Sequence, residues 1–188
     1  AGAEPGRFAG IARVALHRAL VESEDRARRT AIRLRVVADL AADLLKPHSL
    51  EDLDTVLRSA TRRVIDQDAF TFAVYNANDH SLEFMAGWDG DVFEGGAVLP
   101  VAGTPSENVI RERRSLLTTS STDPSASGAH IFGTGLRSES AIRSPVVSGD
   151  DVVAVISVQS YRPNRYTAED VEVLEAIASL TATAMRNI

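Results

Sequence analysis

The sequence contains no cysteine among its 188 residues. This absence excludes disulfide bonds, iron–sulfur clusters and zinc sites held by thiolates, cysteine nucleophiles and covalently attached bilins. Long apolar runs are missing too, because the longest, Val152–Ile156, has five residues and a membrane-spanning helix needs about 20. No hydrophobic region of a signal peptide is visible near the start. We therefore expect no membrane contact within this segment and a cytoplasmic location.

Positive charge is scarce outside the first quarter of the chain. Residues 1–46 carry nine basic and six acidic side chains, whereas the remainder carries eleven basic and twenty acidic ones. A body with this excess of negative charge repels nucleic-acid phosphates, so we expect no nucleic-acid partner. With 44% hydrophobic residues, the chain is long enough for one globular domain with a helical extension.

The N-terminal part carries small and apolar residues in alternating steps of four and three. Such a heptad pattern is typical of helices that supercoil with a partner. It predicts a coiled-coil signalling helix over residues 1–46, which merges into the first helix of a domain at 34–188 and is ended by Pro47. The positions of the pattern are Leu16, Leu20, Ser23, Ala27, Thr30, Leu34, Val37, Ala41 and Leu44.

The middle of the chain alternates helix and strand signals. Ser49 with Asp52 predicts a capping box for a helix to about residue 65, and Thr104-Pro-Ser-Glu107 predicts a second one before a short helix. Residues 119–138 are rich in Ser, Thr and Gly, and a loop of this length inside a domain is often functional. Strands are predicted at 70–75, 82–86, 97–101 and 116–118, with a loop at 87–96.

The last 48 residues contain two apolar strands joined by Gly149-Asp-Asp and followed by a capped helix. The strands are Ala141-Ile-Arg-Ser-Pro-Val-Val and Val152-Val-Ala-Val-Ile-Ser-Val, and the helix follows Tyr166-Thr-Ala-Glu-Asp. This combination resembles the closing strand, strand and helix of a GAF domain, and the resemblance covers residues 34–188. It implies an α+β fold in α/β/α layers, with an antiparallel sheet of about five or six strands, helices on both faces and a long N-terminal helix.

The resemblance also implies a regulatory function. GAF domains of bacterial signal-transduction proteins sense a small molecule and act as parallel homodimers, whose terminal helices relay the ligand state to a histidine kinase of a two-component system, a cyclase, a phosphatase or a transcription activator. We expect such a sensor with an unknown effector, and no enzyme, since a GAF-type reductase needs cysteines. A dimerisation or interaction scaffold without ligand is the alternative. The expected interface residues are Leu16, Leu20, Ala27, Leu34, Val37, Leu44, Leu174, Ala178 and Met185.

Five residues are candidates for lining the ligand pocket, namely Trp88, His130, Phe132, Ser157 and Gln159. Binding pockets are mostly apolar with a few placed polar groups. Ser157 and Gln159 share one side of a strand whose other side carries Ile156 and Val158, which suggests that the polar side faces the pocket. Haem-binding GAF domains take their axial histidine from the region of His130, so a haem-based gas or redox sensor is a third, less favoured hypothesis. No metal site is expected.

Overall fold

The computed structural model describes residues 5–43 and 49–188, apart from some side chains of the first helix. The chain divides into two compact units, residues 1–35 and 36–188. The described helices are α1 (Pro5–Asp43), α2 (Leu50–Val64), α3 (Pro105–Glu112) and α4 (Ala168–Met185), with a 3-10 turn η1 (Pro124–Ala126). The described strands are β1 (Ala69–Asn76), β2 (Ser81–Asp89), β3 (Val92–Glu94), β4 (Val98–Pro100), β5 (Leu116–Thr118), β6 (Ser140–Ser148) and β7 (Asp151–Ser160).

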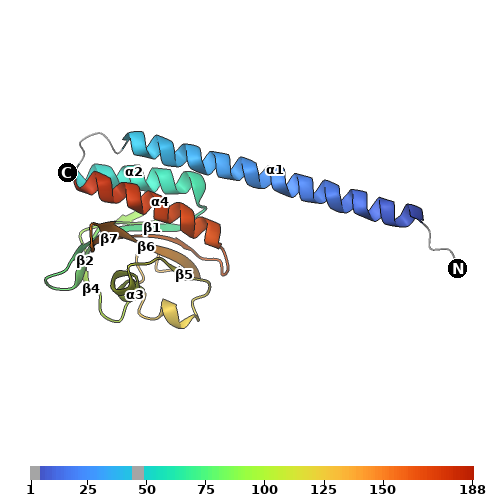
Figure 1. Cartoon of the computed structure of the whole chain (residues 1–188). Helices are drawn as coiled ribbons and strands as arrows, with labels where there is room; N and C mark the ends of the chain where they lie inside the picture. Colours follow the sequence, from blue (N-terminus) through green and yellow to red (C-terminus); the bar gives the residue numbers. More distant parts are fainter. Residues whose placement is uncertain (1–4, 44–48) are drawn as a thin grey trace. The chain divides into compact units, whose positions relative to one another are not determined.

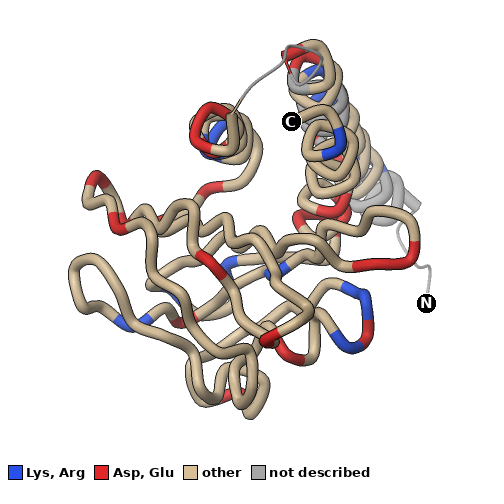
Figure 2. Tube along the Cα trace, turned by 90° about the vertical axis from the view of Figure 1, so that its left-hand side faces the viewer, with Lys and Arg blue, Asp and Glu red and all other residues tan. Residues whose placement is uncertain are grey.

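The strands form one antiparallel sheet in the order β3-β2-β1-β7-β6-β5, with β4 paired to β2 beside β3. The expected α+β fold is therefore confirmed. The described part of the chain has seven strands rather than five or six, because the predicted loop at 87–96 contains β3, which pairs Phe93 with Trp88 of β2. Helices α2 and α4 cover one face of the sheet and α3 lies on the other (Figure 1). The turned view in Figure 2 shows the same layers, with the connecting loops below the sheet.

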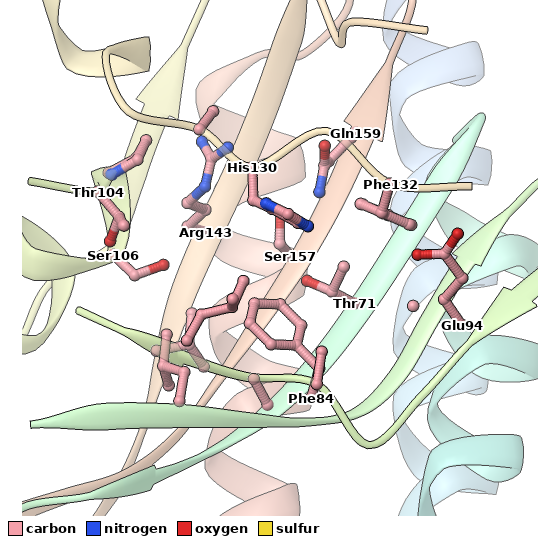
Figure 3. Close-up of a pocket in the computed structure, with 18 of the residues that line it drawn as sticks. Thr71, Phe84, Glu94, Thr104, Ser106, His130, Phe132, Arg143, Ser157 and Gln159 are labelled. Atoms are coloured by element: carbon pink, nitrogen blue, oxygen red, sulfur yellow. The ribbon is translucent and has the colours of Figure 1, made fainter. Parts of the chain in front are cut away.

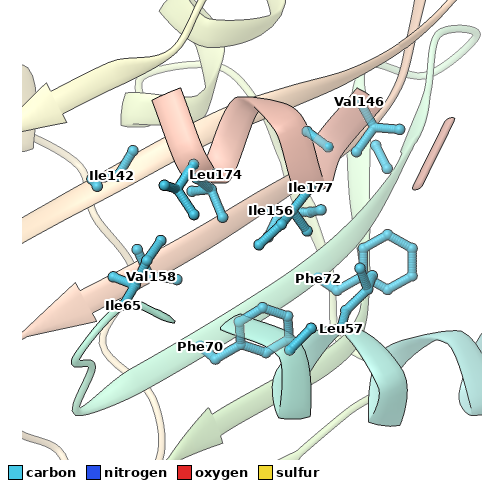
Figure 4. Close-up of a cluster of buried hydrophobic side chains, with 14 of the residues drawn as sticks. Leu57, Ile65, Phe70, Phe72, Ile142, Val146, Ile156, Val158, Leu174 and Ile177 are labelled. Carbon is cyan, nitrogen blue, oxygen red and sulfur yellow. The ribbon is translucent and has the colours of Figure 1, made fainter. Parts of the chain in front are cut away.

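The main hydrophobic core lies between the sheet and the helices α2 and α4 (Figure 4). Phe70 and Phe72 of β1 and Ile156 of β7 point into it and are at most 1% exposed. Burying a large apolar side chain stabilises a fold by roughly 1.5–3 kcal/mol. At the start of α2 the predicted capping box is present, since the Asp52 N–H donates to Ser49 Oγ at 3.3 Å and the Ser49 N–H donates to Asp52 Oδ2 at 3.4 Å.

Two of the expected interface residues on α4 are buried inside the domain. Leu174 and Ala178 are 0% and 2% exposed and belong to the core, so they offer no surface to a partner. The heptad-like spacing of α4 is explained by packing on the sheet, because a helix needs the same kind of apolar stripe to pack on a sheet as to pack on another helix. Met185 is half-buried against the same core.

The expected interface residues of α1 lie on the helix surface where their side chains are described. Leu16 and Leu20 are 64% and 52% exposed, Ala27 is exposed, and Val37 is half-buried. Leu44 lies outside the described residues, and the side chain of Leu34 lies outside the described side chains. Among the described residues, no helix combines the length and hydrophobicity that crossing a bilayer requires.

Candidate ligand-binding cavity

A row of polar residues crosses the sheet on the face away from α2 and α4. The register of the strands places Ser157 of β7 opposite both Thr71 of β1 and Arg143 of β6. Directly opposed side chains have Cβ atoms about 4.5–5.5 Å apart, so the three polar side chains leave the sheet next to one another. Thr71, Ser157 and Arg143 are 6%, 3% and 7% exposed. The sheet therefore buries a row of three polar side chains on this face.

This polar row forms part of the wall of a cavity of about 80 Å³. Figure 3 shows Arg143, Ser157 and Gln159 on the neighbouring strands, with Thr104 and Ser106 at one end of the cavity and Glu94 at the other. A volume of this size holds several water molecules or a compact organic molecule. The remaining lining is largely apolar and includes Ala73, Leu82, Phe84, Leu99, Phe132 and Val155.

Arg143 carries a positive charge into this cavity without a counter-charge. Its Nη1 atom is buried and has no hydrogen-bond partner among the described residues. Burial lowers the pKa of the Arg143 guanidinium from its ordinary value to about 10, so the side chain remains charged at neutral pH. An unpaired buried ion costs several kcal/mol. A buried charged group in a cavity that lowers the stability of the fold is a candidate for ligand binding.

Ser157 presents a second unused polar atom beside Arg143. Its Oγ is buried and has no hydrogen-bond partner in the described part of the chain. Gln159, two residues along the same strand, accepts a hydrogen bond at Oε1 from the Ser138 hydroxyl at 2.7 Å. Gln159 therefore holds the loop that contains Ser138, whereas Arg143 Nη1 and Ser157 Oγ have no hydrogen-bond partner among the described residues.

The loop at 119–138, which we call the roof loop, closes the cavity against the start of α3. Gly128 has a φ of +73°, and a Cβ atom built there would lie 1.8 Å from the carbonyl oxygen of Gly103. Only glycine adopts this left-handed conformation at so short an approach without strain. His130 and Phe132, which follow Gly128, are thereby placed in the cavity lining.

A carboxylate at the end of β2 holds the far part of the roof loop. Asp89 accepts hydrogen bonds at Oδ2 from the backbone N–H of Thr134 at 2.6 Å and from its hydroxyl at 2.5 Å, and at Oδ1 from the Tyr161 hydroxyl. Asp89 is 3% exposed. Hydrogen bonds to a charged acceptor are roughly twice as strong as neutral ones. The Gly133 N–H adds a bond to Glu94 Oε1 at 3.1 Å, so the roof is fastened at several points.

The start of α3 forms one end of the cavity through Thr104, Pro105 and Ser106. The capping box predicted here is absent: the Thr104 hydroxyl donates to the Val101 carbonyl at 2.7 Å, and Glu107 Oε2 accepts from the Gly103 N–H at 2.8 Å. The carboxylate thus reaches one residue further back than predicted. The positive end of the α3 dipole lies at the cavity and favours negative charge there.

Four of the five predicted pocket residues, His130, Phe132, Ser157 and Gln159, line this one cavity. The volume of about 80 Å³ is well below the roughly 300–1,000 Å³ of sites for drug-sized ligands. A haem macrocycle does not fit into this space, so the structure gives no support to His130 as an axial haem ligand.

Trp88 lies on the opposite face of the sheet, which corrects its prediction as a pocket residue. Strand alternation sends its neighbour Gly87 to the cavity and the indole to the helix side. There the ring donates from Nε1 to Asp54 Oδ2 at 3.2 Å and lies 3.7 Å below the Arg58 guanidinium. Burial raises the pKa of Asp54, against the opposing effect of the Trp88 hydrogen bond.

Arg143 and Thr71 are polar residues of the cavity lining that sequence reasoning missed. Thr71 lies between the buried residues Phe70 and Phe72, which is the same signal that identified Ser157, whereas Arg143 lies between Ile142 and the polar Ser144 and lacks this signal. What was lacking was the register across β1, β7 and β6, which brings the three onto one row.

Comparisons with known proteins agree on one family. The family model described as GAF domain matches residues 50–186. A search of curated proteins finds no match. Among solved structures, the GAF domain of a phosphoenolpyruvate-protein phosphotransferase from Coxiella burnetii is 10% identical, with a TM-score of 0.70 over 83% of this chain and 94% of that one.

Two further similar structures come from proteins with different activities. The GAF domain of a two-component sensor histidine kinase from Bacillus halodurans is 15% identical, with a TM-score of 0.63 over 74% of this chain and 95% of that chain. Free methionine-R-sulfoxide reductase from Neisseria meningitidis, in complex with its substrate, is 14% identical, with a TM-score of 0.64 over 84% and 90%. These likenesses show the fold, and together with the family model they establish that the chain belongs to the GAF domain family.

Proposed function

We propose that this chain is the small-molecule-sensing regulatory domain of a signal-transduction protein. The observation that carries the proposal is the roofed cavity, into which Arg143 and Ser157 bring buried polar atoms without partners. The similar fold of a sensor histidine kinase domain supports a signalling role. The reductase of similar fold, solved with its substrate, supports the capacity of the fold to hold a small molecule. The chain acts as sensor and not as catalyst.

The cavity and the helix α4 share two strands through which ligand binding can be transmitted. Strands β6 and β7 supply Arg143 and Ser157 to the cavity on one face, and on the other face they pack Ile142 and Val158 with Leu174 of α4. A ligand that binds one arrangement of these strands better than another shifts the population toward it. We propose that α4 carries this shift to an output domain.

Dimerisation through α1 is the second part of the proposal. Among the described side chains, α1 exposes Val14, Leu16, Leu20 and Val21, each at least 44% exposed. Leu16 and Leu20 belong to the heptad pattern, which favours a coiled coil, and we propose a parallel homodimer. With Leu174 and Ala178 buried in the core, the proposed interface lies on α1, and of the α4 positions only the half-buried Met185 remains a candidate.

A ligand panel read by thermal unfolding tests the sensing function. A ligand that binds only the native state raises apparent stability by an amount set by its concentration over its Kd. We expect at least one compact polar compound to give a saturable rise in Tm. A panel without any such shift contradicts the sensing function.

The alternative is a scaffold that dimerises without ligand, and the exposed apolar side chains of α1 favour it. Sedimentation equilibrium, repeated with and without a panel compound, separates the two. A dimer that forms at the same concentration in both conditions and shows no ligand-dependent Tm supports the scaffold. A monomer at every accessible concentration contradicts both the scaffold and the helical relay.

A further inference from the structure

We infer that the ligand of this cavity is a small organic monocarboxylate, held by the Arg143 guanidinium and the Ser157 hydroxyl. The inference rests on the proposed sensing function and names the chemistry of its effector. It depends on three properties of the cavity: two donors without partners on paired residues, the balance of charge and the apolar character of the remaining lining.

The two unused donors belong to residues that face each other on adjacent strands. Arg143 and Ser157 are a cross-strand pair in the β6–β7 register, and both line the cavity. Nη1 of the guanidinium and Oγ of the serine are buried without partners among the described residues. A carboxylate has two acceptor oxygens, so one group of this kind can accept from both residues at once.

The balance of charge in the lining favours a single negative charge on the ligand. Arg143 is the one arginine of the described lining, and burial is the sole cause of its lowered pKa, so no protein carboxylate compensates it. Glu94, the acidic residue of the lining, already accepts from the Gly133 N–H and lies at the other end of the cavity in Figure 3. A monoanion neutralises the guanidinium, whereas a phosphate dianion would leave a buried excess charge.

The apolar walls set the rest of the ligand. Phe84, Leu82 and Val155 line the cavity beside the polar row. These side chains offer no hydrogen bonds to a small inorganic anion. A short aliphatic body attached to the carboxylate replaces water on these surfaces. The volume of about 80 Å³ restricts this body to a few carbon atoms.

Butyrate is a suitable probe, with butyramide as its neutral counterpart of the same shape and inorganic phosphate as the alternative oxyanion. Thermal unfolding of the full chain is measured at constant ionic strength. At about one hundred times its Kd, butyrate is expected to raise Tm by roughly 5–10 °C. Butyramide and phosphate are expected to give much smaller rises at the same concentration.

Variants locate the effect at the proposed site. Arg143→Met is expected to weaken butyrate binding at least about ten-fold, because a hydrogen bond to a charged group is lost. Ser157→Ala is expected to weaken it a few-fold. Arg111→Met, which removes a guanidinium whose side chain is 60% exposed on α3, is the matched control and should bind butyrate like the wild type.

The outcomes separate this inference from the proposed function. Equal responses to butyrate and butyramide, or an undiminished response in Arg143→Met, overturn the monocarboxylate and leave a sensing cavity. A response to phosphate alone assigns a phosphate-bearing ligand and overturns the inference in the same way. If neither butyrate nor any neutral panel compound shifts Tm, the inference and the sensing function fail together.

Discussion

Arg143 should destabilise the ligand-free domain, and its replacement by methionine should make that domain more stable. One pKa unit corresponds to about 1.36 kcal/mol, so the lowering of the guanidinium pKa by burial to about 10 corresponds to a cost on the order of 3 kcal/mol. Methionine retains much of the apolar length of arginine, and imperfect repacking costs less than about 1.5 kcal/mol. The expected net gain for Arg143→Met is therefore about 2 kcal/mol.

The dependence of this cost on pH follows from the two protonation equilibria. Below pH 10 the side chain is charged in both the folded and the unfolded chain, so the full cost is present at pH 7. Above about pH 10 the folded chain loses the proton before the unfolded chain does, so the unfolded chain binds more protons and stability rises with pH. The gain from Arg143→Met is thus largest at neutral pH and shrinks in strongly alkaline solution.

Urea unfolding at pH 7 measures this effect directly. The midpoint should rise without a change in the m-value, because the surface exposed on unfolding is nearly the same. Thermal unfolding should show a Tm higher by roughly 4–8 °C, whereas the exposed control Arg111→Met should stay within about 0.5 kcal/mol of the wild type. A loss of more than about 1 kcal/mol in Arg143→Met would show that the guanidinium has stabilising partners, and the argument for a ligand would lose its basis.

Three further changes test the roof loop and the helix. Gly128→Ala should cost about 1–3 kcal/mol and speed proteolysis of the roof loop, because a Cβ there would meet a carbonyl oxygen at 1.8 Å; unchanged cleavage would contradict the close approach. Asp89→Ala leaves three donors without their acceptor, so amide hydrogen exchange in the roof loop should accelerate while that of β1 stays slow. The double change Leu16→Ser and Leu20→Ser should weaken dimerisation in sedimentation equilibrium and leave the Tm of the domain unchanged, since both side chains lie more than half exposed on α1.

The fold could be predicted from the sequence because its strongest signals are local. The capping box at Ser49 and the strand alternation around Ser157 depend on neighbours within a few residues, and both are present in the structure. The prediction of a capping box at Thr104 was wrong, because the Glu107 carboxylate accepts from the backbone N–H of Gly103 and not from that of Thr104. Short-range pattern does not decide between two donors one residue apart.

The candidate site required information that a single sequence does not contain. Whether Arg143 faces solvent or cavity depends on its register with Ser157 and on what covers that face. Likewise, the spacing of Leu174 and Ala178 fits a helix packed on a sheet as well as a helix packed on a partner. In both cases the outcome is set by long-range contacts between strands and helices.

For the proposed sensor, the fastened roof loop has a consequence for the time course of the response. A ligand that exchanges through the roof loop enters or leaves when the contacts of Asp89 with Thr134 give way. The rate of response then levels off at the rate of loop opening as effector concentration rises, and a bound effector stays for a residence time set by the loop and not by its own affinity alone. Such a sensor averages over brief fluctuations of its effector and responds to sustained changes.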